Sequence, residues 1–255
     1  MFNEGMGFDF LWSLAILLCV SLVLRQTTQG RASWEIRRVQ GLDAIDEAIG
    51  RATEMNRPVM YLPGYTGLSS PQTLASMTVL SEVAKKTAQY DCRLIVPVQY
   101  PEIHSVLHEV IRQSYIETGH PDRFRSDDVM WFSNHYFGYA IGVIGIMNKE
   151  QIGANIMVGS FAFDALMYGE AASQVGAIQI GGTDGPITDF VVTCDYTLIG
   201  EEMYAAAAYL SKDPKRISSI VVEDWFKYVV TAVVILGSLL NTIGKVDVLS
   251  RILDW

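Results

Sequence analysis

Residues 58–98 read PVMYLPGYTGLSSPQTLASMTVLSEVAKKTAQYDCRLIVPV, and this stretch decides the fold. A short apolar run over 58–62 is followed by a Pro-Gly pair, which is typical of the end of a strand. A helical pattern then covers 71–90, with proline in its first turn. A second apolar run follows over 93–98. An apolar strand, a helix and another apolar strand predict a βαβ unit with two parallel strands.

The same alternation continues along the chain. Its strands are nearly continuous apolar runs, as expected of strands that are buried on both faces. Right-handed crossovers would place helices on both sides of the sheet. The sequence therefore predicts a cytoplasmic α/β domain over residues 41–211, with a Rossmann-like, doubly wound, mainly parallel six-stranded sheet. The remaining strands are expected at 128–132, 154–158, 177–180 and 190–194, and the other helices at 41–55, 101–119, 136–149, 161–174 and 201–210.

The direction of the sixth expected strand is left open by the sequence. Residues 181–189, which connect it to the fifth strand, form a segment that is too short for a helix by pattern. Parallel strands normally need a long crossover connection. Either the sixth strand is therefore antiparallel to the fifth, or the connecting loop crosses the edge of the sheet.

Two strongly apolar segments flank this domain and are predicted to be transmembrane helices. Residues 8–24 read FDFLWSLAILLCVSLVL. A secretory signal peptide is the alternative, but no Lys or Arg precedes the segment and no small-residue cleavage site follows it. Residues 225–244 read WFKYVVTAVVILGSLLNTIG, for which a buried core helix is the alternative. Half of all residues are hydrophobic and only 18% are charged, which agrees with apolar residues concentrated in such segments.

Basic residues gather at the end of each apolar segment that adjoins the central domain in the sequence. These residues are Arg25, Arg31, Arg37 and Arg38 after the first segment, and Lys212, Lys215, Arg216 and Lys227 around the start of the second. By the positive-inside rule, the chain is expected to be a two-pass protein of the cell (inner) membrane, with its central domain in the cytoplasm and both termini outside. The parts outside the helices and the domain are an outer tail (1–7), a basic linker (25–40), a second linker (212–224) and an amphipathic outer tail (245–255).

Net charge and cysteine content exclude several classes of function. The net charge is −9, which argues against sequence-independent binding to nucleic acid, because such binding needs a basic face. Cys19, Cys92 and Cys194 form no CxxC pair, which excludes a disulfide framework and a cysteine-based zinc site and fits a reducing compartment. The expected partners are the lipid bilayer, further copies of the chain in a homo-oligomer, and other membrane proteins.

Glycine and hydroxyl residues gather where the expected strands end. In doubly wound sheets ligands bind beyond the carboxyl ends of the strands, where glycine lets backbone N–H groups approach a phosphate or carboxylate. Neither GxGxxG nor GxxxxGK[ST] occurs, so turn formation and a small-anion or nucleotide-like ligand site both remain open. The candidate ligand-binding residues are Gly64, Thr66, Gly67, Ser160, Gly181, Gly182, Thr183, Asp184 and Asp195.

The sequence contains no complete catalytic or metal-binding set. His104 and His108 are four residues apart on an expected helix, but no third ligand accompanies them. Ser160 lacks the GxSxG frame of a nucleophile elbow. Glu201 and Glu202 are typical of the first turn of a helix, where they favour its dipole. We therefore predict no catalytic residue, no metal and no cofactor.

The second apolar segment carries a face of small and polar residues. Gly237, Asn241 and Gly244 are spaced by four and three residues, so they share one helical face. Small residues permit close helix contact, and an asparagine within the membrane favours a hydrogen-bonded partner. This face is predicted to pack either against the first segment of the same chain or against another subunit.

The chain also resembles a family of uncharacterised membrane-anchored proteins of bacteria and archaea, which is defined by a domain of unknown function. The resemblance covers about residues 35–225. It implies a membrane-tethered α/β domain of unassigned role, and it brings no activity, cofactor or catalytic residue. The segments that carry it are 41–54, 57–59, 91–98, 174–180 and 194–202.

Two functions are compatible with these observations. The first is a non-enzymatic one, in which the tethered domain is an oligomerising scaffold or docking platform. The alternative is a sensor or enzyme that binds a small anion or nucleotide-like ligand at the carboxyl edge of the sheet. A transporter is disfavoured, because neither apolar segment has a central ionisable residue.

Overall fold

A computed structural model gives the architecture of the chain, which divides into two units. One unit is Arg37–Ser211, and the other combines Met1–Ile36 with Lys212–Trp255. The second unit includes the long helix α9 (Pro214–Thr242). The residues that the structure describes are 14, 17–19, 21–23, 25, 40–185, 188–211 and 214–242.

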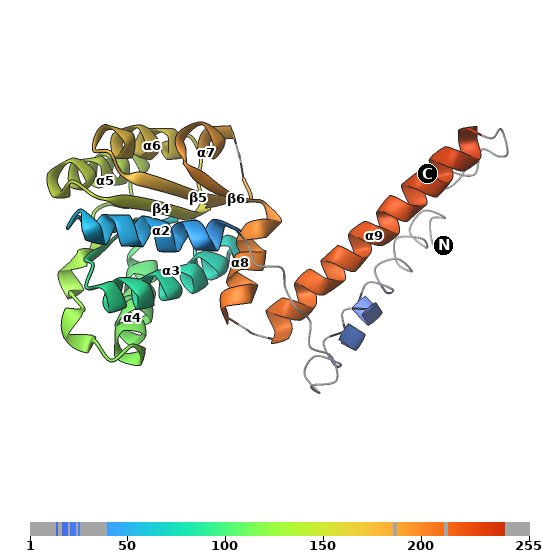
Figure 1. Cartoon of the computed structure of the whole chain (residues 1–255), viewed down its shortest axis with the longest axis horizontal. Coiled ribbons are helices and arrows are strands. Elements are labelled where there is room, and N and C mark those ends of the chain that lie inside the picture. The colour runs from blue at the N-terminus through green and yellow to red at the C-terminus, as the bar shows by residue number, and fades with distance from the viewer. Residues whose placement is uncertain are drawn as a thin grey trace. The chain divides into compact units, whose positions relative to one another are not determined.

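A parallel sheet forms the centre of the first unit (Figure 1). Within the described residues it has six strands in the order β3-β2-β1-β4-β5-β6, and every neighbouring pair is parallel. This arrangement confirms the predicted α/β class. The strand order reverses between β1 and β4, where a doubly wound sheet has its switch point. The strands are β1 (Val59–Gly64), β2 (Leu94–Val98), β3 (Val129–Trp131), β4 (Ala154–Ser160), β5 (Ile178–Thr183) and β6 (Tyr196–Ile199).

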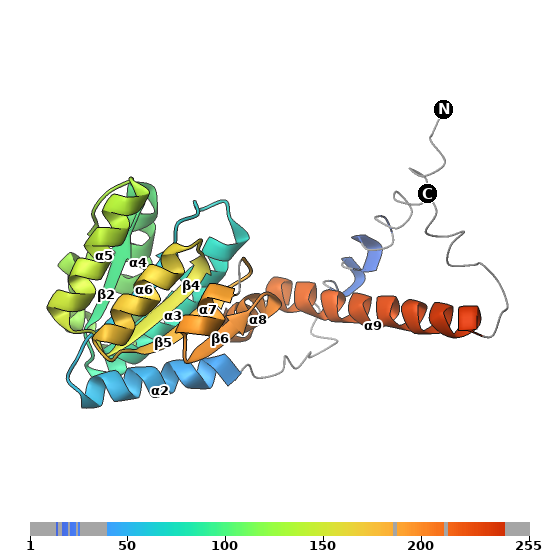
Figure 2. The ribbon, with the colours of Figure 1, turned by 90° about the horizontal axis from the view of Figure 1, so that it is seen from above.

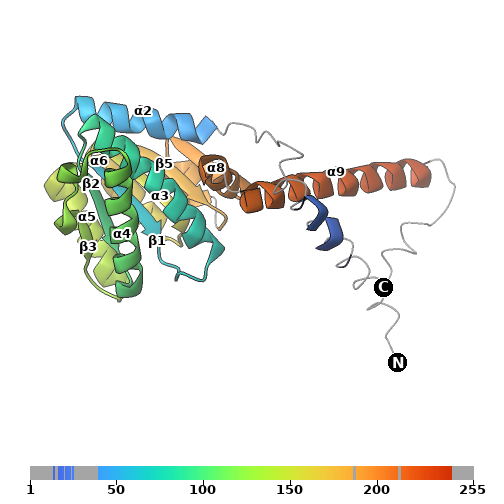
Figure 3. The same cartoon turned by 90° about the horizontal axis from the view of Figure 1, so that it is seen from below.

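Helices cover both faces of the sheet. Figure 2 shows α5, α6 and α7 along one face, and Figure 3 shows α3 and α4 side by side on the other. A hydrophobic core lies under each helical layer. The first layer contains α2 (Gln40–Glu54), α3 (Pro71–Tyr90), α4 (Pro101–Glu117) and α8 (Glu201–Ser211), and the second contains α5 (Tyr136–Glu150), α6 (Asp164–Gln174) and α7 (Thr188–Thr193).

The central strand β1 shows how the sequence builds both cores. Neighbouring side chains of a strand point to opposite faces of the sheet. Val59 and Tyr61 accordingly enter the core under α2 and α3, whereas Met60 and Leu62 enter the core under α5 and α6. All four are fully buried, which explains why the strand is apolar throughout instead of alternating.

The predicted sixth strand at 190–194 is wrong. Residues Thr188–Thr193 form the short helix α7, and the strand is Tyr196–Ile199. Within this helix only the Phe190 side chain is buried, and Val191 and Val192 are exposed. The β-branched run is therefore not a core strand but one and a half turns of helix. This helix makes the crossover that allows β6 to pair parallel to β5, so both sequence-based alternatives for this connection were incorrect.

None of the helices, as far as the structure describes them, is both long and apolar enough to cross a membrane. Most of the predicted first span, 8–24, lies outside the described residues, as do the last two residues of the second, 225–244. Residues 26–39 of the basic linker and the tails 1–7 and 245–255 also lie outside them.

Candidate functional site

The switch point between β1 and β4 is where the fold favours a site. Four of the candidate residues lie here: Gly64 and Ser160 end β1 and β4, and Thr66 and Gly67 lie in the loop after β1. Thr183 ends β5 on the same edge of the sheet and Asp184 follows it. The structure therefore brings these six residues to one carboxyl edge, as the sequence predicted. Whether they bind a ligand stays a prediction.

Close backbone packing explains the glycines at the switch point. Gly64 has a φ of +84°, and a Cβ there would lie 2.5 Å from the carbonyl oxygen of Ser160. Gly159 has a φ of +149°, and its Cβ would lie 2.2 Å from the carbonyl oxygen of Pro63. The N–H of Tyr65 donates to the Ser160 carbonyl at 3.1 Å, so pairing between the two strands continues into the loop. These glycines permit β1 and β4 to approach each other.

Polar side chains at this edge bond to one another. The hydroxyls of Thr66 and Thr73 are 2.9 Å apart. The carboxylate of Asp184 accepts from the Gln72 amide at 2.7 Å and from the Tyr204 hydroxyl at 2.5 Å. Asp184 thereby links the loop after β5 to α3 and α8. These bonds give the polar residues a structural role that needs no ligand.

Two further glycines serve packing inside β5. Gly181 faces the ring of Phe190, where a Cβ would lie 2.0 Å from a ring carbon. Gly182 faces Val158, where the corresponding distance is 3.3 Å. Both residues are buried within the strand and not in a loop. Thr183, at the strand end, accepts the N–H of Gly185 on its hydroxyl at 3.1 Å and so stabilises the turn.

Asp195 was expected to follow a strand at the carboxyl edge, and this placement is wrong. The residue precedes β6 and therefore lies at the opposite, amino edge. Its carboxylate accepts the N–H of Gln179 at 2.8 Å, and its own N–H donates to the Gln179 carbonyl at 2.9 Å. Asp195 thus starts the pairing of β6 with β5. The cause of the error is the misplaced sixth strand.

A buried carboxyl and three tyrosines form a cluster that sequence reasoning missed. Asp164, in the first turn of α6, accepts the N–H of Ala162 at 2.7 Å and is hydrogen-bonded to Tyr136 of α5. Burial raises the pKa of Asp164. One helical turn later lies Tyr168, whose buried hydroxyl has no partner among the described residues and whose ring meets that of Tyr139 edge-on at 6.4 Å. The spacing of Asp164 and Tyr168, four residues apart, was the available signal.

We expect Asp164 to give the chain a specific pH dependence. The pKa of Asp164 is raised above 3.8, so the folded chain holds this proton more tightly than the unfolded chain. The contribution of Asp164 to the unfolding free energy therefore falls as the pH rises through the raised pKa. Asp164→Asn removes this contribution because asparagine does not titrate. Urea unfolding between pH about 4 and about 7 should show wild-type stability falling relative to the variant. Wild-type stability that stays constant or rises relative to Asp164→Asn over this pH range would contradict the assignment.

The two spaced histidines bond to separate partners. His104 Nε2 lies 2.9 Å from the carbonyl oxygen of Val129, and His108 Nε2 lies 2.9 Å from the Ser126 hydroxyl. Over the described residues, no group of three or more His, Cys, Asp or Glu side chains is arranged to hold a metal ion. These contacts give both histidines a role in holding α4 against the start of β3 and the turn before it.

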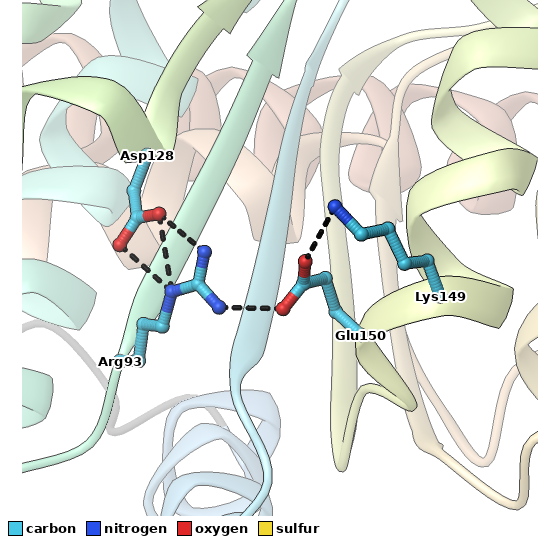
Figure 4. Close-up of polar contacts among 4 residues, drawn as sticks. All are labelled: Arg93, Asp128, Lys149 and Glu150. Atoms are coloured by element: carbon cyan, nitrogen blue, oxygen red, sulfur yellow. Dashed lines mark hydrogen bonds and ion pairs between the residues drawn. The ribbon is translucent and has the colours of Figure 1, made fainter.

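Figure 4 shows the charged cluster at the amino edge of the sheet. Arg93 donates from Nε and Nη2 to the Asp128 carboxylate, at 2.7 to 3.1 Å, and from Nη1 to Glu150 at 2.6 Å. Lys149 lies 3.6 Å from Glu150. The cluster joins the starts of β2 and β3 to the end of α5. Because it lies at the edge opposite the switch point, we interpret it as structural.

Exposed apolar side chains gather on the outer side of α5 and α6. Phe137 and Ile141, one turn apart on α5, are 61% and 68% exposed. Phe163 and Leu166, at the start of α6, are 50% and 39% exposed. The rings of Phe137 and Phe163 lie 6.1 Å apart, so the two helices share one surface. We call these four residues the apolar ridge.

The chain matches, over residues 1–253, the family described as Domain of unknown function (DUF6754), and it belongs to this family. No curated protein and no solved structure matches the chain. The match confirms the resemblance to an uncharacterised family. Membrane anchoring and a bacterial or archaeal source remain predictions from the sequence.

Proposed function

We propose that this family member is a non-catalytic scaffold: a cytoplasmic α/β domain that is tethered to the cell membrane and assembles protein subunits through its apolar ridge. The ridge is the observation that carries the proposal. Large apolar side chains that are grouped and exposed mark interaction surfaces in soluble domains. Two aromatic rings at its centre are the residue type that most often dominates binding energy at interfaces.

The chemistry at the carboxyl edge supports the same proposal. The switch-point glycines are used for strand packing, and the polar groups of Thr66 and Asp184 bond to neighbouring side chains. A ligand would therefore have to displace contacts that already stabilise the fold.

The sequence supplies the tether, through the apolar segments 8–24 and 225–244 and the basic residues that flank them.

Native purification tests the scaffold directly. We expect the chain, extracted in mild detergent, to elute in a complex larger than one subunit. Phe163→Ser should dissociate this complex, because it removes an aromatic group from the ridge. The control is Tyr90→Ser, because Tyr90 is 52% exposed at the end of α3, in the other helical layer. A monomeric chain that retains a bound metabolite would overturn the scaffold.

The topology can be tested separately. A reporter inserted near Ser126 should be cytoplasmic, whereas reporters at either terminus should be outside, because basic residues border both apolar segments on the domain side. Cytoplasmic readings at both termini would contradict the two-span arrangement.

A second candidate function is small-ligand binding at the carboxyl edge. The observation that favours it is the buried Tyr168 hydroxyl, which has no partner within the described residues and lies one turn from Asp164. A ligand that bonds this hydroxyl should raise the melting temperature of the wild type and not that of Tyr168→Phe. A panel of nucleotides and metabolites without any thermal shift would argue against this function.

A further inference from the structure

We infer that the occupant of the apolar ridge is a second copy of this chain, which packs its own α5 antiparallel against α5 of the first. This inference rests on the proposed function, and it names the partner. Such an antiparallel pair has a two-fold symmetric interface, so the ridge must be complementary to itself. The shape and charge of the ridge meet this requirement.

The shape of α5 is self-complementary. Phe137, Ile141 and Gly145 follow one another at a spacing of four residues, so they form one line along the helix. Gly145 is exposed, and nothing lies within 4 Å of the position of a Cβ there. If two α5 helices pack antiparallel and their two-fold axis passes next to Ile141, Phe137 of each copy faces Gly145 of the other. The large Phe137 ring of each copy thus fills the open space beside Gly145 of the other copy, and this contact occurs twice in the pair.

Charge favours a second copy on this surface. Copies of a chain with net charge −9 repel one another over most of their surface. On α5 and α6, the exposed charged residues are Lys149 and Glu170, which have opposite signs. The other layer is different, since α2 alone carries Asp43, Asp46, Glu47 and Glu54 against Arg51. The ridge is therefore a surface where apolar burial is not opposed by like charge.

The same charges disfavour a lipid surface as the occupant. Surface helices that bind membranes carry Lys and Arg beside their apolar face, because anionic lipids attract them. Lys149 is the one exposed basic residue of α5 and α6, and it lies three turns from Phe137. Membrane binding would also be strengthened by any apolar side chain added to this surface. Binding of a second copy would not be strengthened by a side chain added at the position that Phe137 of the other copy fills.

Gly145→Leu separates these alternatives. It adds apolar surface to an exposed helical position, where leucine also favours helix formation. For the full chain in mild detergent, we expect the dissociation constant between copies, measured by sedimentation equilibrium, to rise at least tenfold, because leucine occupies the space for Phe137. Combining Gly145→Leu with Phe137→Ala should restore the dissociation constant to within about threefold of the wild-type value. In this double variant the large side chain is at position 145 and the small one at position 137, so the two still fit together. The control is Gly50→Leu in α2, where likewise nothing lies within 4 Å of a Cβ.

Photo-crosslinking from benzoylphenylalanine at position 163, in native membranes, identifies the occupant. The expected adduct has twice the mass of the chain, and Gly145→Leu should reduce its yield at least tenfold. An adduct with a different polypeptide would overturn the second copy but leave the scaffold intact. An adduct with lipid alone would overturn both. Unchanged or tighter association of Gly145→Leu, or failure of the double variant to recover, would also overturn the antiparallel pair.

Discussion

Replacing Gly159 with alanine is expected to destabilise the α/β domain strongly. Gly159 lies near the end of β4 with a φ of +149°, a region that side-chain-bearing residues rarely adopt. The strain alone costs about 1–3 kcal/mol. A Cβ would also lie 2.2 Å from the Pro63 carbonyl oxygen, and this atom belongs to the neighbouring strand and cannot rotate away. We expect a total loss of at least about 3 kcal/mol, out of a typical stability of about 5–15 kcal/mol.

Urea unfolding followed by tryptophan fluorescence measures this loss. Gly50→Ala is the matched control, because Gly50 is in the middle of α2 with nothing within 4 Å of its Cβ position. It should be neutral or stabilising by up to about 1 kcal/mol, since alanine is the better helix former. If Gly159→Ala cost no more than the control, the close approach of β1 and β4 at the switch point would be incorrect.

The sequence predicted the first βαβ unit well, because local signals mark its boundaries. The expected helix at 71–90 is found as Pro71–Tyr90. Proline fixes the backbone of its first turn. At its other end Asp91 adopts a left-handed conformation and its N–H bonds to the Thr87 carbonyl, which ends the helix. Strand ends then locate the carboxyl edge, so most candidate residues were expected at the correct edge of the sheet, while their binding of a ligand stays a prediction.

Tertiary packing determines what the sequence did not predict. Tyr136 and Asp164 meet only because α5 and α6 lie side by side, and no local pattern links residues 28 positions apart. The apolar ridge was missed for another reason. Apolar side chains occur on every side of α5, so the pattern did not distinguish buried Tyr139 and Val143 from exposed Phe137 and Ile141.

Arg93→Met is expected to destabilise the domain by about 2 kcal/mol at neutral pH. The side chain of Asp128 is only 6% exposed, and removal of Arg93 leaves its carboxylate buried without this partner. Breaking a buried pair costs about 3–5 kcal/mol, and partial exposure of Arg93 reduces this value. Lys149→Met is the control, because Lys149 is 81% exposed and should contribute less than about 0.5 kcal/mol.

The cost of Arg93→Met should depend on pH with a defined sign. Arg93 lowers the pKa of Glu150 below its usual 4.5. A carboxyl with a lowered pKa stabilises the folded state above its unfolded pKa, and this contribution is lost as the pH falls through the folded pKa. The difference in unfolding free energy between wild type and Arg93→Met should therefore shrink in acid, below about pH 4.5.

Because Glu150 ends α5, loss of its contact with Arg93 should also loosen the helix that carries Phe137 and Ile141. Hydrogen exchange at the last turn of α5 should accelerate in Arg93→Met and remain unchanged in Lys149→Met. Equal exchange in both variants would mean that Arg93 stabilises the strand starts alone.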